Sequence, residues 1–387
     1  MPKRILILIG IPNFNYHNPN SAVLSYLKQI EKAFKDEGHT VILDFRDNIE
    51  VSEDPNINQE KKGVLQKLKS AVKLWPWFYH SLVMSKYLKS QNHLYDELAA
   101  LEPFDLIVEF HTVGSTIGLK LSRLWSASLS VIFDSPVDQQ FLEMHGTKTW
   151  KWKSIVESEK KTIEEANKVM CYSLPCQEYL DKKYSLKGEI NILPCVITKE
   201  SNVQRVKSDI FNIGFVGSFL SWHKLELLVE VFQEFYVRHE DARLILVGYG
   251  EEWNRIKKIA SSSEVSSAIE MPGFVDEKEL NYYKSIFTIA TMPGSNWYGS
   301  PLKLFEYGQN GIPFIAPVSD TVSDIFEEGE HCLFVQKEDE KGSLLAALET
   351  MYSNSEKRES LGLAAKQMIN DRYNLTTYKE QLINCLT

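Results

Sequence analysis

One stretch of the chain, residues 299–313, combines a helix start, a lysine and a carboxylate at spacings suited to a phosphorylated ligand. Ser300 is of a type that caps a helix and Pro301 suits the first helical position, so a helix of about three turns is expected from Ser300. Its N-terminus would present unpaired backbone N–H groups to an anion, and Lys303 adds a cation one turn in. Glu306 is placed to accept hydrogen bonds from hydroxyls.

The spacing of these groups leaves two interpretations open. A phosphate at the helix start and a diol at the carboxylate are what a nucleotide sugar presents. The alternative is an ordinary amphipathic helix with a Lys303–Glu306 surface pair. In either case Gly311 can end the helix in a left-handed conformation, and Pro313 prevents its continuation.

The elements that position this stretch follow from alternating short apolar runs and helical patterns. In the first half, strands are expected at residues 4–10, 41–45, 106–110, 129–133, 169–172 and 191–193. Residues 21–37 carry apolar side chains at helical spacing before Gly38. Apolar strands that alternate with helices indicate a parallel sheet covered on both faces.

The alternation restarts after residues 199–209, a polar stretch that we interpret as a linker. The expected strands are 212–216, 243–247, 270–274, 287–292 and 313–316, with helices at 225–238, 252–260 and 280–284. The fold class is therefore α/β, with two Rossmann-like, doubly wound parallel-sheet domains. Ligands of such folds bind beyond the carboxyl ends of the strands, which here predicts the cleft between the domains.

The composition excludes several classes of protein. With 387 residues, 43% apolar and 25% charged, the chain is neither disordered nor fibrous. No apolar run reaches the roughly 18 residues of a membrane span. A net charge of −9 argues against a nucleic-acid partner. Five scattered cysteines fit neither a disulfide framework nor a zinc site, and the N-terminus fits a strand better than a signal peptide, so we expect a cytoplasmic protein.

The charge is unevenly distributed along the chain. Residues 1–200 carry 25 basic and 25 acidic side chains, whereas residues 201–387 carry 18 and 27. Within the neutral half, residues 61–90 contain seven lysines and no carboxylate, interleaved with aromatic side chains. This pattern suits an interfacial helix on anionic lipid, broken by Pro76. The alternative is an amphipathic core helix with a solvated lysine face.

The 299–313 stretch resembles the donor-site motif of retaining GT-B glycosyltransferases, in particular glycosyltransferase family 4, the glycosyl transferases group 1. Glu306, Gly311 and Pro313 match the second half of that motif, and Tyr298 stands where its first Glu is usual. The resemblance implies that Glu306 binds the ribose hydroxyls of the nucleotide. The residues that would hold the diphosphate or the donor sugar are Gly299, Ser300, Pro301, Leu302 and Lys303. The contact of the missing carboxylate would fall to Tyr298 or to the backbone.

Further segments of the second half resemble the donor domain of the same family. Gly217 ends a strand, Ser218 takes the place of the usual Arg, and the later Lys position falls on His223 or Lys224. Lys224 and Lys303 are then the cations left for the pyrophosphate, unless Lys224 is a solvated surface lysine. Gly248 lies in a turn that resembles the LVGxG turn of the family. The segment whose backbone contacts the nucleobase would consist of Gly273, Phe274 and Val275.

In the first half, residues 5–10, 104–111 and 193–197 resemble counterparts in the family. We assign His111, Asn20 and Ser21 to the acceptor side, with a structural role as the alternative for His111. Asp134 stands where the family often has a His near the donor sugar. It would bind a sugar hydroxyl or stabilise positive charge at the anomeric carbon, unless it merely caps the next turn.

The mechanism implied by the resemblance needs no protein nucleophile, and no paired carboxylates stand out in the sequence. The leaving diphosphate would be stabilised by Lys303, Lys224 and helix N–H groups, with Asp134 beside the sugar. No metal site of the DxD type is evident. We therefore expect no metal and no cofactor beyond the nucleotide sugar donor.

The expected protein is a hexosyltransferase-type glycosyltransferase that moves a sugar from a nucleotide diphosphate sugar to a glycan or lipid-linked acceptor. Retention of configuration and a role in cell-surface polysaccharide or glycoconjugate synthesis follow from the resemblance. The alternatives are a non-hydrolysing sugar-nucleotide epimerase of the same fold and a non-catalytic scaffold subunit. The expected location is the cytoplasm. The alternative is a peripheral position on the inner face of the cell membrane, held there by residues 61–90.

The expected division of labour follows the two series of strands. The assigned segments are residues 1–198 for acceptor binding, 199–209 as the linker, 210–372 for the nucleotide sugar donor, and 373–387 as a helix that crosses back to the N-terminal domain.

Overall fold

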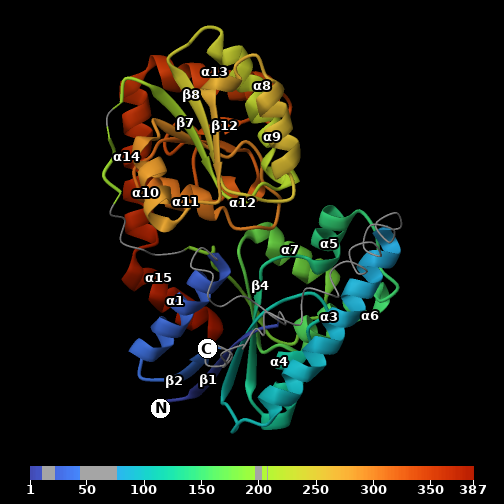
Figure 1. The fold of residues 1–387 in the computed structure, drawn as a ribbon. Helices are drawn as coiled ribbons and strands as arrows, with labels where there is room; N and C mark the ends of the chain where they lie inside the picture. Colours follow the sequence, from blue (N-terminus) through green and yellow to red (C-terminus); the bar gives the residue numbers. More distant parts are fainter. Residues whose placement is uncertain (11–21, 44–75, 197–202, 207) are drawn as a thin grey trace. The chain divides into compact units, whose positions relative to one another are not determined.

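The computed structural model describes most of the chain in two compact units (Figure 1). The described residues are 1–10, 22–43, 76–196, 203–206 and 208–387. The first unit comprises the described parts of Met1–Tyr172, Cys176–Leu193 and Lys379–Thr387, and the second those of Ser173–Pro175 and Pro194–Tyr378. The assignment of these units to acceptor and donor stays a prediction.

The first unit is built on a six-stranded parallel sheet in the order β2-β1-β3-β4-β5-β6. Its strands are β1 (Arg4–Ile9), β2 (Thr40–Leu43), β3 (Leu106–Phe110), β4 (Ser128–Phe133), β5 (Lys168–Cys171) and β6 (Glu189–Ile192). The helices that accompany them are α1 (Ala22–Asp36), α3 (Pro76–Ala99), α4 (Ile117–Trp125), α5 (Val137–His145), α6 (Trp152–Glu165), α7 (Leu174–Lys183) and α15 (Leu375–Leu386). All five residues of β3 are buried, as a strand covered on both faces requires.

The second unit repeats this plan with the strand order β12-β11-β10-β7-β8-β9. Its strands are β7 (Phe211–Val216), β8 (Ala242–Val247), β9 (Ile269–Gly273), β10 (Ile289–Thr291), β11 (Phe314–Pro317) and β12 (Leu333–Val335). Its helices are α8 (Leu225–Tyr236), α9 (Trp253–Ser262), α10 (Glu277–Ile286), α11 (Leu302–Gln309), α12 (Asp320–Ser323), α13 (Glu340–Ser353) and α14 (Ser355–Arg372), with short 3₁₀ turns η2 (Ser221–His223) and η3 (Ser266–Ala268). Figure 1 shows α8 and α9 on one side of this sheet and α10, α11 and α14 on the other.

Helix α8 illustrates why the second unit folds this way. Leu225, Leu228, Val229, Phe232 and Phe235 recur every three to four residues and therefore share one face. All five are buried in one apolar core with side chains of β7 and β8. Burying each such side chain contributes about 1.5–3 kcal/mol, which holds α8 against the sheet.

Both predicted parallel sheets are confirmed, and the first eleven strands lie where apolar runs predicted them. Strand β12 was missed because it has only three residues, two of them partly exposed, and depends on its pairing with β11. The helices that were not predicted individually are α4, α5, α6, α7, α12, α13 and α14. Pro76 begins α3, and residues 61–75, on which part of the lysine-rich prediction falls, lie outside the described residues.

Candidate functional site

Lys303 is the centre of a tight arrangement in the second unit. Its Nζ lies 2.9 Å from Nε2 of His223, which belongs to the 3₁₀ turn after β7. The same ammonium lies 5.7 Å from the centroid of the Phe215 ring. The loop after β7 and the first turn of α11 therefore bring a cation, a histidine and an aromatic ring together near the carboxyl end of a strand.

His223 acts as the hydrogen-bond acceptor of Lys303. Its Nδ1 lies 3.2 Å from the carbonyl oxygen of Gly294, and because a carbonyl only accepts, Nδ1 must carry the proton. Nε2 then offers its lone pair to the ammonium. Burial, reinforced by the charge of Lys303, holds the pKa of His223 well below its usual range, so the ring is neutral.

Lys303 itself is a cation with little solvent around it. Burial lowers the pKa of its ammonium to about 8, against the opposing influence of Glu306. Below that pH the ammonium keeps its charge, and its direct hydrogen-bond partner is a neutral imidazole. A desolvated cation of this kind interacts more strongly with an anion than a solvated surface lysine does.

Gly217 is the residue that lets Lys303 reach this position. Its φ of +149° lies outside the range that residues with a side chain favour. A Cβ added there would stand 2.0 Å from Cε of Lys303. The glycine predicted at this strand end is thus required by the close approach of the lysine to the backbone.

Glu306 is held by a partner that the sequence did not reveal. Nζ of Lys284, on α10, donates to Oε1 of Glu306 at 2.7 Å. The Lys284 side chain is 6% exposed, whereas that of Glu306 is 41% exposed. One carboxylate oxygen is therefore fixed by a buried lysine while the side chain still meets solvent, which suits a group that accepts hydrogen bonds from a ligand.

The start of α11 differs from the expectation. The helix begins at Leu302 with Pro301 at the N-cap position, and Ser300 is not its cap. The Ser300 hydroxyl instead donates to the carbonyl of Cys195 at 2.9 Å. The helix is consequently eight residues long rather than three turns, and Gly311, with φ of +63°, follows its end as predicted.

The two residues before Ser300 are also engaged within the unit. The N–H of Gly299 donates to Oδ1 of Asn296 at 2.7 Å. Tyr298 is buried, and its ring is edge-on to that of Trp297, with 5.5 Å between the ring centroids. Whether Tyr298 takes over the contact of a missing carboxylate stays a prediction.

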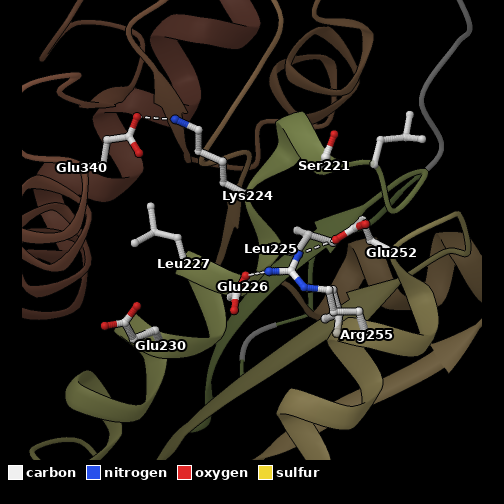
Figure 2. Close-up of a pocket in the computed structure, with 11 residues that line it drawn as sticks. Ser221, Lys224, Leu225, Glu226, Leu227, Glu230, Glu252, Arg255 and Glu340 are labelled. Atoms are coloured by element: carbon white, nitrogen blue, oxygen red, sulfur yellow. Dashed lines mark hydrogen bonds and ion pairs between the residues drawn. The ribbon is translucent and has the colours of Figure 1, made fainter. Parts of the chain in front are cut away.

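Lys224 lines an acidic pocket of about 400 Å³, where its side chain is directed to Glu340 (Figure 2). Its ammonium forms an ion pair with Glu340, and Arg255 pairs with Glu226 and Glu252. A diphosphate would be repelled by the surrounding carboxylates. A role for Lys224 in binding diphosphate stays a prediction, and it requires the lysine to leave Glu340.

The remaining predicted donor residues surround the carboxyl ends of β7, β8 and β9. The N–H of Gly248 donates to the carbonyl of Gly273 at 2.9 Å, so these two turns are joined. Phe274 is exposed, Val275 is partly buried, and Ser218 is exposed in place of the expected Arg. Their contacts with a nucleotide stay predictions.

In the first unit, His111 belongs to a buried ionic network. Its Nε2 lies 3.7 Å from Oε2 of Glu159, and its ring stacks on Phe133. Glu159 also accepts hydrogen bonds from Nζ of Lys183 at 3.1 Å and from the hydroxyl of Tyr184. Burial alone would raise the pKa of Glu159, but His111, Lys183 and Tyr184 together lower it to about 2. The sequence did not indicate this network.

Asp134 lies directly after β4 and is partly exposed. Burial raises the pKa of its carboxyl to about 6, and the hydroxyl of Tyr172 opposes this shift. Its role beside a sugar stays a prediction. Asn20 and Ser21, also predicted for the acceptor side, lie outside the described residues. Among the residues that the structure describes, no group of His, Cys, Asp and Glu side chains could hold a metal ion.

Comparisons with known proteins match the second unit to a family. Residues 196–368 match the family model described as Glycosyl transferases group 1. The alpha-monoglucosyldiacylglycerol synthase of Acholeplasma laidlawii is 26% identical over 184 residues. That match covers 43% of this chain and 46% of the relative, so it spans about half the length of that protein. The family resemblance seen in the sequence is confirmed.

Solved structures match nearly the whole chain. HepE of Anabaena, solved in complex with UDP-glucose, has a TM-score of 0.68 at 13% identity. The match covers 99% of this chain and 99% of that chain. Sucrose-phosphate synthase of Thermosynechococcus elongatus has a TM-score of 0.70 at 17% identity, with 99% of this chain and 98% of that chain covered. At these identities the likeness shows the fold, and the predicted GT-B fold class is confirmed.

The packing of Lys303 against Gly217 predicts a specific loss of stability. Gly217→Ala adds a methyl group at the Lys303 side chain and a backbone strain of about 1–3 kcal/mol, because its φ is positive. The overlap adds to this cost, because the end of the Lys303 side chain must move away from its position beside His223. Gly329→Ala is the matched control, because its φ is +74° but its nearest neighbour is 3.8 Å away. Equal shifts of the urea midpoint in the two variants would contradict the close approach.

The ionic network of the first unit predicts a dependence of stability on acid. The pKa of Glu159 is lower in the folded state, so its contribution is present above about pH 4.5 and is lost as the pH falls towards 2. Glu159→Gln should lower the free energy of unfolding by about 3 kcal/mol at pH 7 and by progressively less below pH 4.5. Urea titrations of both proteins at pH 7, 4 and 2.5 measure the difference.

The control for this measurement is Glu157→Gln on the same helix. Glu157 pairs with Lys161 at the surface, where an ion pair contributes little. If the difference in free energy of unfolding between Glu159→Gln and the unaltered protein stays constant with pH, the carboxylate is not the stabilising group.

Proposed function

We propose that the chain is a glycosyltransferase with a nucleoside diphosphate sugar as donor, on the basis that residues 196–368 match the family model described as Glycosyl transferases group 1. One observation carries the proposal. Helix α11 presents the desolvated ammonium of Lys303 and, one turn later, the partly exposed carboxylate of Glu306. The cation suits a diphosphate and the carboxylate suits the ribose hydroxyls, so one helix offers both groups that such a donor needs.

The proposed reaction proceeds with retention and without a protein nucleophile. The bond between the anomeric carbon and the diphosphate oxygen breaks, and negative charge develops on the leaving group. Lys303 stabilises this charge electrostatically. The acceptor hydroxyl attacks from the same face and passes its proton to the departing phosphate. Asp134, with its pKa raised to about 6, is proposed to stabilise positive charge at the sugar.

We propose a hexose as the transferred sugar and a glycan or lipid-linked molecule as the acceptor. The name of the Acholeplasma relative, a glucosyldiacylglycerol synthase, supports a lipid acceptor. Helix α3 supports contact with an anionic membrane, since Trp77 is 48% exposed and Lys86 and Lys89 are exposed. Within the described ranges no helix has the length and hydropathy of a membrane span. Cytoplasmic location and a peripheral position at the membrane belong to the same proposal.

The experiment that tests the proposal is a thermal-shift screen of the protein against UDP-, GDP-, ADP- and CMP-sugars. A shift with one class identifies the donor, and no shift with any of them favours a scaffold role. Glu306→Ala should weaken binding of the matching nucleotide by about 10–100-fold, because it removes a hydrogen bond to a charged group. The exposed Glu264→Ala is the matched control. Undiminished binding or activity in Glu306→Ala would refute the site.

Lys284→Met separates the orientation of Glu306 from its presence. The variant keeps the carboxylate but removes the lysine that fixes it at 2.7 Å. We expect nucleotide binding to weaken, but less than in Glu306→Ala. Equal losses in the two variants would mean that Lys284 contacts the ligand itself rather than positioning Glu306.

The pKa of Lys303 predicts how donor binding depends on pH. Because the ammonium loses its proton near pH 8, nucleotide affinity should hold to about pH 8 and then fall by up to tenfold for each pH unit. Isothermal titration of the nucleotide from the screen between pH 7 and 9.5 measures this fall. Bound diphosphate raises the pKa of Lys303, so each binding event takes up protons above pH 8.

Lys303→Arg is the test variant for this pH dependence, because a guanidinium stays charged throughout the range. Its affinity is expected to be lower at pH 7 but flat up to pH 9.5. A fall that persists in Lys303→Arg would assign the titration to another group.

A further inference from the structure

A cavity of about 530 Å³ in the first unit has no place in the function proposed above. It is lined by residues of α3, α4 and α6 and by the residue that precedes α6, and three of the lining residues are lysines. These are Lys89 from α3, Lys120 from α4 and Lys151 immediately before α6. We call this the lysine groove.

The lysine groove has cations and no counter-charge. No Asp or Glu is among the residues that line it. Among the described residues, none gives Lys89, Lys120 or Lys151 a carboxylate partner, and Lys120 instead lies 5.3 Å above the ring of Tyr95. Other lysines of this unit pair with acids, as Lys161 does with Glu157. Three like charges that line one cavity give it a positive potential, which would attract an anion.

The polar groups of the groove suit a phosphate in particular. The amide of Asn92 and the hydroxyls of Thr116 and Ser154 line the same cavity. Ammonium groups together with neutral donors form the charge-assisted hydrogen bonds that phosphate oxygens accept. The volume leaves room for a group attached to the phosphate.

The groove borders the edge of the sheet where ligands of such folds bind. Gln91 lines the groove, and its Nε2 donates to the carbonyl of Gly10 at 3.0 Å and to that of Val113 at 3.1 Å. Gly10 directly follows β1 and Val113 lies just beyond β3, so both mark the carboxyl ends of strands. A molecule whose phosphate occupies the groove therefore has its remainder beside the carboxyl edge of the first unit's sheet.

We propose that the lysine groove binds the phosphate of a phosphate-bearing acceptor, as a monoester or a diester. The identity of this ligand as an acceptor rests on the proposed glycosyl transfer, whereas phosphate binding by the groove does not. The phosphate has two possible sources, a soluble phosphoester or the head group of a lipid. Both present the same anion to the three lysines.

The test uses the full chain and glycerol phosphate as the soluble probe, with glycerol as its uncharged counterpart. The groove variant is Lys89→Gln, Lys120→Gln and Lys151→Gln combined. The control variant is Lys148→Gln, Lys153→Gln and Lys160→Gln, which removes equal charge from neighbouring exposed positions that do not line the groove. We expect calorimetric affinity for glycerol phosphate to fall at least tenfold in the groove variant and less than twofold in the control.

Vesicles distinguish the two sources of phosphate. If the ligand is a lipid head group, sedimentation with phosphatidylglycerol vesicles falls in the groove variant, stays in the control, and is weak for phosphatidylcholine. If the ligand is soluble, only glycerol phosphate binding falls. Unchanged binding of both probes in the groove variant, or equal losses in groove and control variants, would overturn the inference.

The nucleotide screen keeps this result separate from the proposed function. All six substituted lysines are exposed, so melting temperatures should stay within a few degrees of the unaltered protein and nucleotide binding should be unchanged. Groove-dependent phosphate binding without any nucleotide binding would reject the glycosyltransferase proposal but keep the groove. Nucleotide binding without groove-dependent phosphate binding would reject the groove but keep the glycosyltransferase proposal.

Discussion

The burial of the Lys303 ammonium is the constraint on which the second unit's site depends. Removing a charge from water is unfavourable, and here it lowers the pKa of the lysine to about 8. The position is tolerated only because Gly217 has no side chain and because His223 stays neutral with its lone pair turned to the ammonium. The carbonyl of Gly294 fixes that tautomer. Strand end, 3₁₀ turn and helix start are thus coupled through one cation.

The same helix keeps its cation and its carboxylate apart. Lys303 and Glu306 were open to interpretation as a surface pair, but Lys303 contacts His223 and Glu306 binds Lys284. Had the two paired with each other, each charge would have been neutralised within the helix. Because the buried Lys284 on α10 holds the carboxylate of Glu306, the ammonium of Lys303 stays unpaired with that carboxylate, and both groups remain suited to a ligand.

The sequence predicted what depends on local pattern and missed what depends on distant contacts. Apolar runs located eleven strands, the motif around α11 singled out Lys303 and Glu306 as candidates, and the segment at the end of β7 singled out Gly217. Lys284 and the Glu159 network left no signal, because their partners lie 22 and 48 residues away on other elements. Ser300 failed as a cap for the same reason, since a carbonyl 105 residues distant takes its hydroxyl. Local propensity gives way where tertiary hydrogen bonds compete.

Net charge proves a poor guide to where an anion binds in this protein. The second half carries 27 acidic against 18 basic side chains, yet its proposed phosphate site lies there. Exposed carboxylates are screened by salt beyond about 8–10 Å, whereas a partly buried ammonium is screened much less. In the acidic pocket, moreover, carboxylates are already paired with Lys224 and Arg255. In the neutral first unit, the reverse holds, because Lys89, Lys120 and Lys151 line one cavity to which no carboxylate contributes. Burial and pairing, rather than the sum of charges, are therefore what single out the lysines proposed to bind a phosphate.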